Sequence, residues 1–417
     1  MDEEMREFRL LQEEDIDAAV RMVRDAFPAA GLPDPEEHAD SLAIALGMPD
    51  SHTWGVFESG RMLGTMRTHD FVMNAFGQQI PVQGLGGVAV GLCDKKRKVA
   101  RDMVRWFLQR SWDEGAAMTS LYPFLASFYE RMGWGVGTPM HRFQLEPSSF
   151  PKRACEGVFR NLGEPDRESI RACYSRMQSR THGMFQLDAR SLDAIRTDEV
   201  PRVIGVEFDG RLEAYILFQF EALKGSNMLL HDLIVTQWTY ESQRGLHGLL
   251  GFLRNQADQV RRVTLLTQDR HLHHLFTDPL DGSENHIQLN HQISERGSGI
   301  MYRVIDPARL LEQLADHNFG DVDLICGIDL KDGFWEKTSA RVELQVERGR
   351  ARIVKGAPAS TPCLKISVSD FSSLVMGVVP LGRLLDYGLA ELSAESLREP
   401  LEAAFKATEA PRCTTRF

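Results

Sequence analysis

The sequence predicts a mixed α/β fold of the α+β kind, in which two similar units, each built around a central mixed sheet, precede a smaller third unit. Strand and helix patterns alternate along residues 1–150, and the same order of elements recurs along residues 151–294. Along residues 295–417 the pattern changes to charged, alternating strands and short helices. We therefore expect three domains with these bounds.

The first unit is expected to open with a helix and a hairpin. Apolar residues recur at helical spacing from Asp15 to Phe27. Two apolar runs, 53–57 and 62–66, then flank Ser59-Gly60, a pair typical of a tight turn between antiparallel strands. This pattern predicts a β-hairpin.

The rest of the first unit is the most informative stretch of the chain. A glycine-flanked apolar strand at 84–90 leads through a cationic loop, 95–98, into an amphipathic helix. A further strand is expected at 118–124. Ser127 and Glu130 then have the spacing of a capping box, which predicts the start of a short helix.

The cationic loop has the chemistry of an anion site. Lys95, Lys96, Arg97 and Lys98 precede a helix whose first backbone N–H groups lack a partner inside the helix and whose dipole is positive at that end. A strand that leads into such a helix end suits a pyrophosphate. This arrangement indicates an enzyme that uses an acyl-CoA.

The second unit repeats these elements without the cationic loop. Asp209-Gly210 again joins two apolar strands, and a later helix at 248–260 and strand at 263–267 complete the repeat. Its loop at 237–244 carries one cation, so we expect no cofactor there.

The third unit is expected to begin after a polar, glycine-bearing stretch. Residues 294–299 have the composition of a linker. A strand at 300–304 and a helix at 307–315 follow, and then further strands and three helical stretches.

Composition excludes several classes of protein. Of 417 residues, 43% are hydrophobic and 26% charged, as in ordinary globular domains. A formal net charge of −11 argues against a nucleic-acid binder, which needs a basic surface. The start of the sequence lacks the apolar segment of a signal peptide, and no run approaches a membrane span of about 20 apolar residues. We expect a cytoplasmic protein that has no membrane partner.

Cysteines and histidines do not form a recognisable metal or disulfide pattern. The six cysteines lie far apart without Cys-x-x-Cys spacing, which favours reduced thiols. The histidine-rich stretch has no carboxylate or cysteine at a ligand spacing, so we expect no metal and interpret its members as loop or interface residues. They are His271, His273, His274, His286 and His291.

The motifs of the first unit resemble those of GNAT N-acetyltransferases, in particular the enhanced intracellular survival (Eis) family. Val88-Ala-Val90 and the segment 95–100 are similar to the acetyl-CoA motif Arg/Gln-x-x-Gly-x-Gly/Ala, with Lys95 at the Arg/Gln position and Lys98 at a glycine position. Leu121-Tyr-Pro-Phe and Ser127-Phe-Tyr-Glu-Arg-Met-Gly are similar to blocks of the Eis family.

This resemblance covers the whole chain and has several implications. It implies a catalytic GNAT domain, a second GNAT-like domain without catalysis, and a sterol-carrier-like domain. It implies acetyl-CoA as co-substrate, a primary amine acceptor of aminoglycoside, polyamine or lysine-like type, and a hexamer built as a trimer of dimers. The residues expected to bind the cofactor are Val88, Ala89, Val90, Lys95, Lys96, Arg97, Lys98, Val99, Ala100, Arg101, Phe124 and Leu125.

The resemblance also assigns the proton transfers. Tyr129 is similar to the general acid of the family, which protonates the departing thiolate. A phenol with a pKa of about 10 can protonate a thiolate whose conjugate acid has a pKa of about 8.5 only in favourable geometry. The alternative is that Tyr129 only packs in the core.

The last residue, Phe417, is implied to supply its terminal carboxylate as the general base. An aromatic side chain can anchor the carboxylate in a pocket, although a frayed tail is the usual state of a chain end. Arg416 would repel polycationic amines, and Asp25 and Tyr122 are further candidates for the acceptor pocket. A second class of function stays open, namely a protein with reduced catalysis that binds CoA or an apolar ligand.

Overall fold

A computed structural model of the protein describes residues 6–152, 157–188, 202–223, 229–283, 285–338, 341–354, 358 and 360–417. The chain divides into two units. The first comprises Met1–Gly137, Ile300–Ala410 and Arg416–Phe417, and the second comprises Thr138–Gly299 and Pro411–Thr415. No helix in the described parts of the chain combines the length and the apolar character that crossing a lipid bilayer requires.

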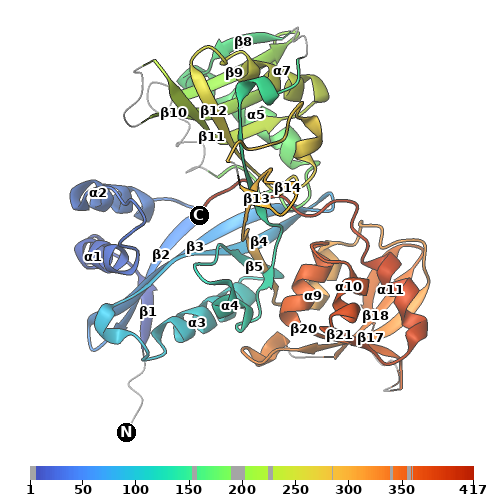
Figure 1. The fold of residues 1–417 in the computed structure, drawn as a ribbon. Coiled ribbons are helices and arrows are strands. Elements are labelled where there is room, and N and C mark those ends of the chain that lie inside the picture. Colours follow the sequence, from blue (N-terminus) through green and yellow to red (C-terminus); the bar gives the residue numbers. More distant parts are fainter. Residues whose placement is uncertain are drawn as a thin grey trace. The chain divides into compact units, whose positions relative to one another are not determined.

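The first unit contains a seven-stranded sheet with the order β1-β2-β3-β4-β5-β16-β6 (Figure 1). All neighbouring strands are antiparallel except β4 and β5, which are parallel. The strands are β1 (Glu7–Leu10), β2 (Ser51–Glu58), β3 (Arg61–Ala75), β4 (Gln78–Val90), β5 (Met118–Leu121), β6 (Gly135–Val136) and β16 (Met301–Val304).

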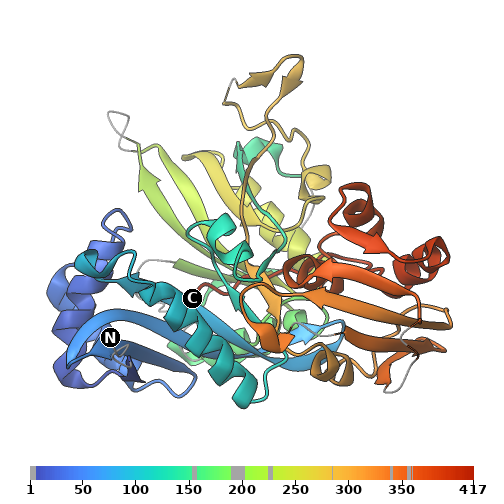
Figure 2. The same ribbon diagram turned by 90° about the horizontal axis from the view of Figure 1, so that it is seen from below.

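Helices cover both faces of this sheet because its side chains alternate between two apolar clusters. Phe57 and Met62 pack with α1 and α2 on one face, whereas Trp54 and Met66 pack with α3 on the other. Figure 2 shows α3 lying across the strands. The helices are α1 (Ile16–Ala26), α2 (Pro35–Leu46), α3 (Val99–Asp113) and α4 (Ala126–Glu130).

The second unit has a sheet of the same design, with the order β15-β7-β12-β11-β10-β9-β8. Here the parallel pair is β11 and β12. The elements are β7 (Met140–Leu145), β8 (Val158–Asn161), α5 (Arg167–Gln178), β9 (Arg202–Phe208), β10 (Arg211–Ala222), β11 (His231–Tyr240), α7 (Gln243–Arg254), β12 (Val260–Thr267), the small hairpin β13 (His286–Ile287) and β14 (Asn290–His291), and β15 (Glu295–Gly297).

The two predicted hairpins are confirmed. Ser59 and Gly60 have φ of 50° and 78°, and Asp209 and Gly210 have φ of 54° and 76°. Positive φ at both central residues is the signature of a type I′ turn, whose twist matches that of the flanking antiparallel strands. The matching turns explain why the repeat can be read from the sequence.

Each of the two sheets contains a strand that pairs with strands distant in the sequence, and the sequence does not reveal these pairings. The predicted linker at 294–299 contains β15, which pairs with β7. The strand predicted at 300–304 is β16, which lies in the first sheet between β5 and β6. In the same way β7 follows β6 in the chain but pairs with β12. The predicted linker therefore ends at Gly299, where the second unit ends, but it contains a strand, because backbone pairing leaves no signal in local composition.

The third domain lies within the first unit and has a five-stranded sheet with the order β19-β18-β17-β20-β21. The strands are β17 (Leu324–Lys331), β18 (Arg341–Glu347), β19 (Arg350–Val354), β20 (Cys363–Ser367) and β21 (Ala390–Leu392). The helices are α8 (Pro307–Gln313), α9 (Val368–Val375), α10 (Leu381–Asp386) and α11 (Arg398–Ala404).

A buried ion pair connects this domain with the first sheet. Arg303 on β16 is fully buried and pairs with Asp332, which follows β17. The Arg303 guanidinium also donates to the carbonyl of Met132. The other Asp332 oxygen accepts the N–H groups of Phe334 and Trp335. Met132 follows α4 by two residues, so the pair also holds the end of that helical segment.

Candidate active site

β4 loses one of its two neighbours halfway along. Val82–Leu85 pair with β5, whereas the pairing with β3 continues to Val90. Residues 86–90 therefore present one edge of backbone N–H and C=O groups that no strand of the described chain pairs. An extended ligand can hydrogen-bond to such an edge as an added strand does.

A β-bulge accompanies this divergence. Gly87 and Val88 together oppose Met66 of β3, since Gly86 pairs with Arg67 and Ala89 with Thr65. Gly87 has φ of 57°, in the left-handed region that glycine adopts without cost. A bulge increases the local twist and bends the strand, which turns β4 away from β5.

The cationic loop between β4 and α3 has strained backbone at two lysines. Lys96 has φ of 67° and Lys98 has φ of 64°. For a residue with a Cβ atom the left-handed conformation costs about 1–2 kcal/mol. Lys98 thus takes the conformation that the glycine of the resembled motif adopts freely. Strain of this kind concentrates at functional sites.

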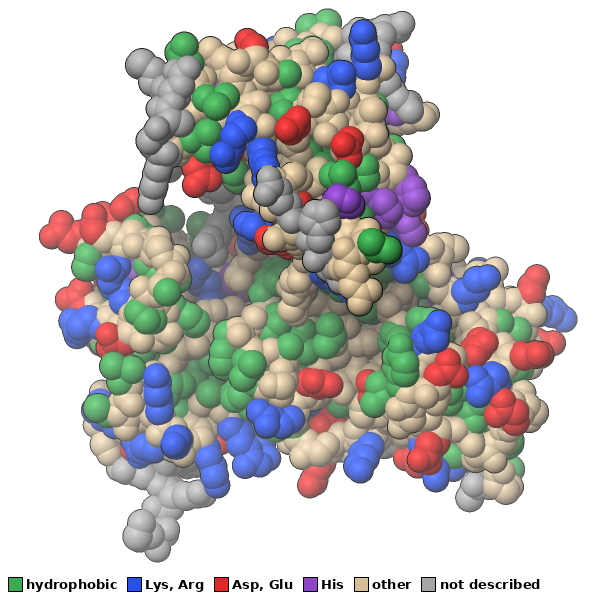
Figure 3. Space-filling view, viewed as in Figure 1, with side chains coloured by type: hydrophobic (Ala, Val, Ile, Leu, Met, Phe, Trp, Pro, Cys, Tyr) green, Lys and Arg blue, Asp and Glu red, His purple; other side chains and the backbone are tan. Residues whose placement is uncertain are grey.

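The start of α3 presents free backbone donors next to these cations. The first helical hydrogen bond runs from the Asp102 N–H to the Lys98 carbonyl, at 3.0 Å. The N–H groups of Val99, Ala100 and Arg101 therefore have no acceptor inside the helix. Lys95, Lys96, Arg97 and Lys98 are all exposed, and Figure 3 shows Lys and Arg side chains gathered over α3. The helix end thus offers an anion both donors and positive charge.

A buried carboxylate that the sequence analysis missed holds this loop. Asp94 accepts hydrogen bonds from Arg61 at 2.7 and 2.9 Å and from Arg97 at 2.6 Å. The bond to Arg61, followed by that to Arg97, lowers the pKa of Asp94 to about 2. Arg97 also pairs with Glu58 at 2.5 Å. The guanidinium of Arg97, an expected cofactor ligand, is thus engaged by two carboxylates.

Tyr129 lies on α4 and is 4% exposed. Its ring meets Phe124, Phe128 and Trp134 edge-on, with centroids 5.7, 5.1 and 6.0 Å away. Burial raises the pKa of the phenol to about 12, so it is protonated at neutral pH. Phe124 and Leu125, both expected cofactor contacts, precede this helix and are exposed.

The predicted capping box at the start of α4 is wrong. The chain is extended at Leu125 and becomes helical at Ala126, so Ser127 lies inside the helix. The helix ends at Glu130, and Gly133, with φ of 91°, lies in the turn that follows it.

The ring of Phe417 packs against three other rings on the other side of β4. Its ring centroid lies 5.3 Å from His69, 4.8 Å from Phe71 and 5.3 Å from Tyr122. A Cβ atom at Gly86 would stand 3.2 Å from the terminal carboxyl carbon. The carboxyl group therefore lies where β4 loses its partner. His69 and the role of Gly86 were missed, because single histidines and glycines in a strand carry no signal of their own.

The phenol and the terminal carboxyl occupy opposite faces of β4. Leu85 packs in the same cluster as Tyr129 and α3, whereas Gly86 faces Phe417. Successive side chains of a strand point to opposite faces. The unpaired edge of β4 therefore runs between the phenol on one face and the terminal carboxyl group on the other.

The three pocket candidates differ in position. Tyr122 is half-buried and packs against Phe417, whereas Asp25 and Arg416 are exposed. Asp25 lies one residue before the end of α1.

The corresponding helix of the second unit begins differently. α7 begins at Gln243 and ends at Arg254, so the helix predicted at 248–260 is misplaced. Ser242 accepts the Gly245 N–H and thereby caps the helix. The neighbouring carboxylate of Glu241 pairs with Arg176 and Arg211. A carboxylate and a side-chain cap therefore stand where the first unit has lysines and free N–H groups.

The remaining expectations concern metals and thiols. Within the described residues, no three His, Cys, Asp or Glu side chains are grouped so that they could hold a metal ion. Five cysteines are free, and Cys155 lies outside the described residues.

Comparisons with known families find three matching regions along the chain. Residues 7–137 and 177–304 match two families that are both described as acetyltransferase (GNAT) domains. Residues 312–414 match the sterol carrier protein domain family. No curated protein matches the chain.

Several solved structures have the same fold along the whole chain. A GCN5-related N-acetyltransferase from Anabaena variabilis aligns with a TM-score of 0.83 at 14% identity, over 99% of this chain and 100% of that one. One from Kribbella flavida gives a TM-score of 0.77 at 19% identity, over 99% and 98%. Eis1 from Mycobacterium abscessus gives 0.75 at 18% identity, over 99% and 100%. At such identities the likeness concerns the fold. Together with the domain matches, it shows that this protein has the fold of Eis1, with two GNAT acetyltransferase domains followed by a sterol carrier protein domain.

Proposed function

We propose that the first domain transfers the acetyl group of acetyl-CoA to a primary amine, of aminoglycoside, polyamine or lysine-like type, and that the second GNAT domain does not catalyse. The observation that carries this proposal is the position of the Phe417 carboxyl group at the point where β4 loses its partner. A base there is next to the edge along which the acetyl-pantetheine arm would lie.

Each part of the site has a role in this reaction. The pyrophosphate of CoA binds at Lys95, Lys96 and Lys98 and at the N–H groups that begin α3. The pantetheine arm follows residues 86–90, with the N–H groups of Val88 and Val90 close to the carbonyl oxygen. Donors at that oxygen stabilise the negative charge that develops when the amine attacks.

Two proton transfers complete the cycle. The Phe417 carboxylate takes a proton from the substrate ammonium, which frees the nitrogen lone pair for attack on the thioester carbon. A C–N bond forms, the C–S bond breaks, and the departing thiolate takes the phenol proton of Tyr129. The acylated nitrogen then loses its second proton, which returns to the Tyr129 phenolate, and the Phe417 carboxyl group gives its proton to water. Because burial raises the pKa of Tyr129 to about 12, the phenol is present as the acid throughout the neutral range.

Substitution of the two groups tests the mechanism. Tyr129→Phe and deletion of Phe417 should each lower kcat strongly and leave acetyl-CoA affinity nearly unchanged. Phe417→Ala keeps the terminal carboxylate but removes the ring and its aromatic contacts, so it should resemble the deletion. Tyr387→Phe, at an exposed tyrosine of the third domain, is the matched control. A near-normal rate in either of the first two variants would exclude that residue from the mechanism.

Ligand binding separates this proposal from a protein without catalysis. Acetyl-CoA at one hundred times its Kd should stabilise the folded state by about 2.7 kcal/mol, which a thermal shift measures. No shift would favour the alternative, an apolar-ligand binder. A shift without turnover would favour a CoA-binding protein with reduced catalysis.

Two further parts of the proposal rest on the resemblance and on the co-substrate. We expect a hexamer built as a trimer of dimers, which light scattering tests. We expect a cytoplasmic location, where acetyl-CoA is available, and cell fractionation tests it.

A further inference from the structure

Cationic side chains line the face of the sheet that carries the terminal carboxyl group. Arg67 on β3 stands directly opposite Gly86 of β4 and directly opposite Thr53 of β2. Residues directly opposite in antiparallel strands share a face, with their Cβ positions about 5 Å apart. The Arg67 side chain therefore leaves the sheet on the Phe417 side, next to the glycine that the carboxyl group covers.

Two helices bring further charge to Arg67. Arg24 of α1 is half-buried, and its guanidinium donates to the Pro33 carbonyl, just ahead of α2. His38 of α2 is half-buried as well, and burial, followed by the charges of Arg24 and Arg67, lowers the pKa of its imidazole. Both charges that act on His38 are thus positive. Its Nδ1 atom is shielded from solvent and has no hydrogen-bond partner among the described residues.

Arg24 and Arg67 therefore place two guanidinium groups on the side of the sheet where the terminal carboxyl group lies. A monoamine needs only the carboxylate, whereas every further ammonium group of a polycation would meet these guanidinium groups.

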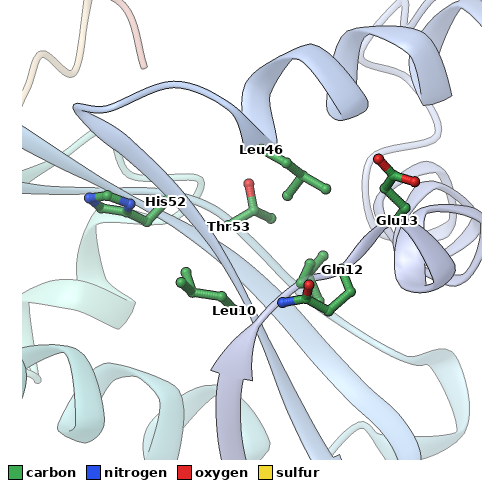
Figure 4. Close-up of a pocket in the computed structure, with 7 residues that line it drawn as sticks. Leu10, Gln12, Glu13, Leu46, His52 and Thr53 are labelled. Atoms are coloured by element: carbon green, nitrogen blue, oxygen red, sulfur yellow. The ribbon is translucent and has the colours of Figure 1, made fainter.

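A pocket lies at Thr53, the β2 residue directly opposite Arg67 (Figure 4). It has a volume of about 240 Å³ and lies between β1, β2 and the end of α2, with Leu46 on one side and the exposed Glu13 at its rim. In Figure 4 the Thr53 hydroxyl points from β2 into this space. Thr53 is 6% exposed, and its hydroxyl has no hydrogen-bond partner within the described chain. A buried hydroxyl without a partner is a site at which a ligand atom gains a hydrogen bond.

We propose that the acceptor of this enzyme is an amine that also carries an anionic group, a carboxylate or a phosphate, and that Arg67 and Arg24 bind that group. This inference rests on the proposed function. The Phe417 carboxylate takes the ammonium end of the acceptor and the guanidinium groups take its anionic end. Arginine suits this task because its planar fork binds both oxygens of a carboxylate or phosphate at once. Thr53 offers a further donor to the part of the acceptor that enters the pocket.

Matched amines test the inference. Acetyl transfer is measured by thiol release with 6-aminohexanoate and hexylamine, with phosphoethanolamine and ethanolamine, and with spermidine. Each amine that carries an anionic group should exceed the counterpart that lacks this group in kcat/KM by about tenfold or more, as expected for a hydrogen bond between charged groups. Preference for the first or the second anionic amine distinguishes a carboxylate from a phosphate acceptor.

Variants test whether Arg67 and Arg24 cause the preference for an anionic amine. Arg67→Met should reduce the ratio between 6-aminohexanoate and hexylamine by about tenfold, mainly through KM. Arg21→Met, at an exposed arginine of α1, is the matched control and should leave the ratio unchanged. Thermal unfolding of both variants verifies that they fold. If Arg67→Met does not fold, Arg24→Met should reduce the same ratio.

The outcomes separate the two proposals. Equal rates with both members of a pair, or a preference for spermidine, would overturn the inference and leave acetyl transfer intact. An unchanged ratio in a folded Arg67→Met variant would overturn the assignment to Arg67. Absence of transfer to every amine of the set would overturn the proposed function and the inference with it.

Discussion

Gly86→Ala should reduce acetyl transfer without weakening the fold. A Cβ atom at this position would stand 3.2 Å from the terminal carboxyl carbon of Phe417, closer than nine in ten real Cβ contacts. Since Gly86 does not have a positive φ, alanine fits the backbone. The added methyl group must therefore displace the carboxyl group by a few tenths of an ångström, while the nearby His69 Nε2, at 3.5 Å, is an ordinary contact.

The magnitude follows from the sensitivity of proton transfer to position. A misplacement of about 1 Å can cost a hundredfold in rate, so a shift of a few tenths should cost about tenfold in kcat, or about 1.4 kcal/mol. Alanine in a strand is more favourable than glycine by roughly 0.5–1 kcal/mol, because glycine loses more conformational freedom on folding. Activity should therefore fall while the unfolding midpoint stays or rises.

A double-mutant cycle shows whether the tail carries this effect. Gly86→Ala is made in the full chain and in a chain that lacks Phe417, and kcat and acetyl-CoA affinity are measured in all four proteins. In the shortened chain the substitution should have almost no effect. Gly333→Ala is the control, because its Cβ would meet nothing within 4 Å and its φ is not positive. A tenfold loss in both backgrounds would refute the reasoning and assign Gly86 to cofactor binding instead.

Three further predictions concern the cofactor loop, the acid and the core. Lys98 has a backbone conformation that glycine adopts freely, so Lys98→Gly should keep the shape of the loop and relieve its strain while removing the ammonium group. The acetyl-CoA Kd should therefore rise severalfold in calorimetry, less so at high salt. Burial raises the pKa of Tyr129 to about 12, so in the folded protein this phenol should stay protonated at pH values at which an unfolded tyrosine ionises. Its contribution to the free energy of unfolding should be complete below about pH 10 and lost toward about pH 12. The pH profile of kcat should show no ionisation of this phenol below about pH 11. Arg303→Met leaves Asp332 buried without its partner and should cost about 3–5 kcal/mol in urea unfolding, part of which Asp332→Asn should restore.

The local parts of the fold could be predicted from the sequence because they depend on neighbouring residues. The two turns at Ser59-Gly60 and Asp209-Gly210 need residues that tolerate positive φ, and these stand between apolar runs. The pairing of strands that are distant in the sequence could not be predicted in this way. β16 pairs with β5 and β6, which precede it by more than 150 residues, and short strands of this kind carry no mark of their partner.

The site could be predicted only where the chemistry repeats a motif. The cationic loop and Tyr129 stand in stretches that resemble a family, whereas His69 and Asp94 do not. Both are buried polar residues, at 1% and 3% exposure, whose roles depend on what surrounds them in three dimensions. Asp94 matters because Arg61 and Arg97 converge on it, and His69 because the ring of Phe417 packs against it.

The position of the terminal carboxyl group depends on a narrow balance. Residues 411–415 belong to the second unit, where the Arg412 N–H donates to the His182 carbonyl, so only Arg416 and Phe417 are ordered by contacts in the first unit. Ordering two residues costs about 2–4 kcal/mol. Three aromatic contacts at about 0.5–1.5 kcal/mol each, together with burial of the ring, are of the same size. The ring of Phe417 therefore contributes enough to keep the carboxylate beside Gly86, so the proposed base depends on a side chain that takes no part in the chemistry.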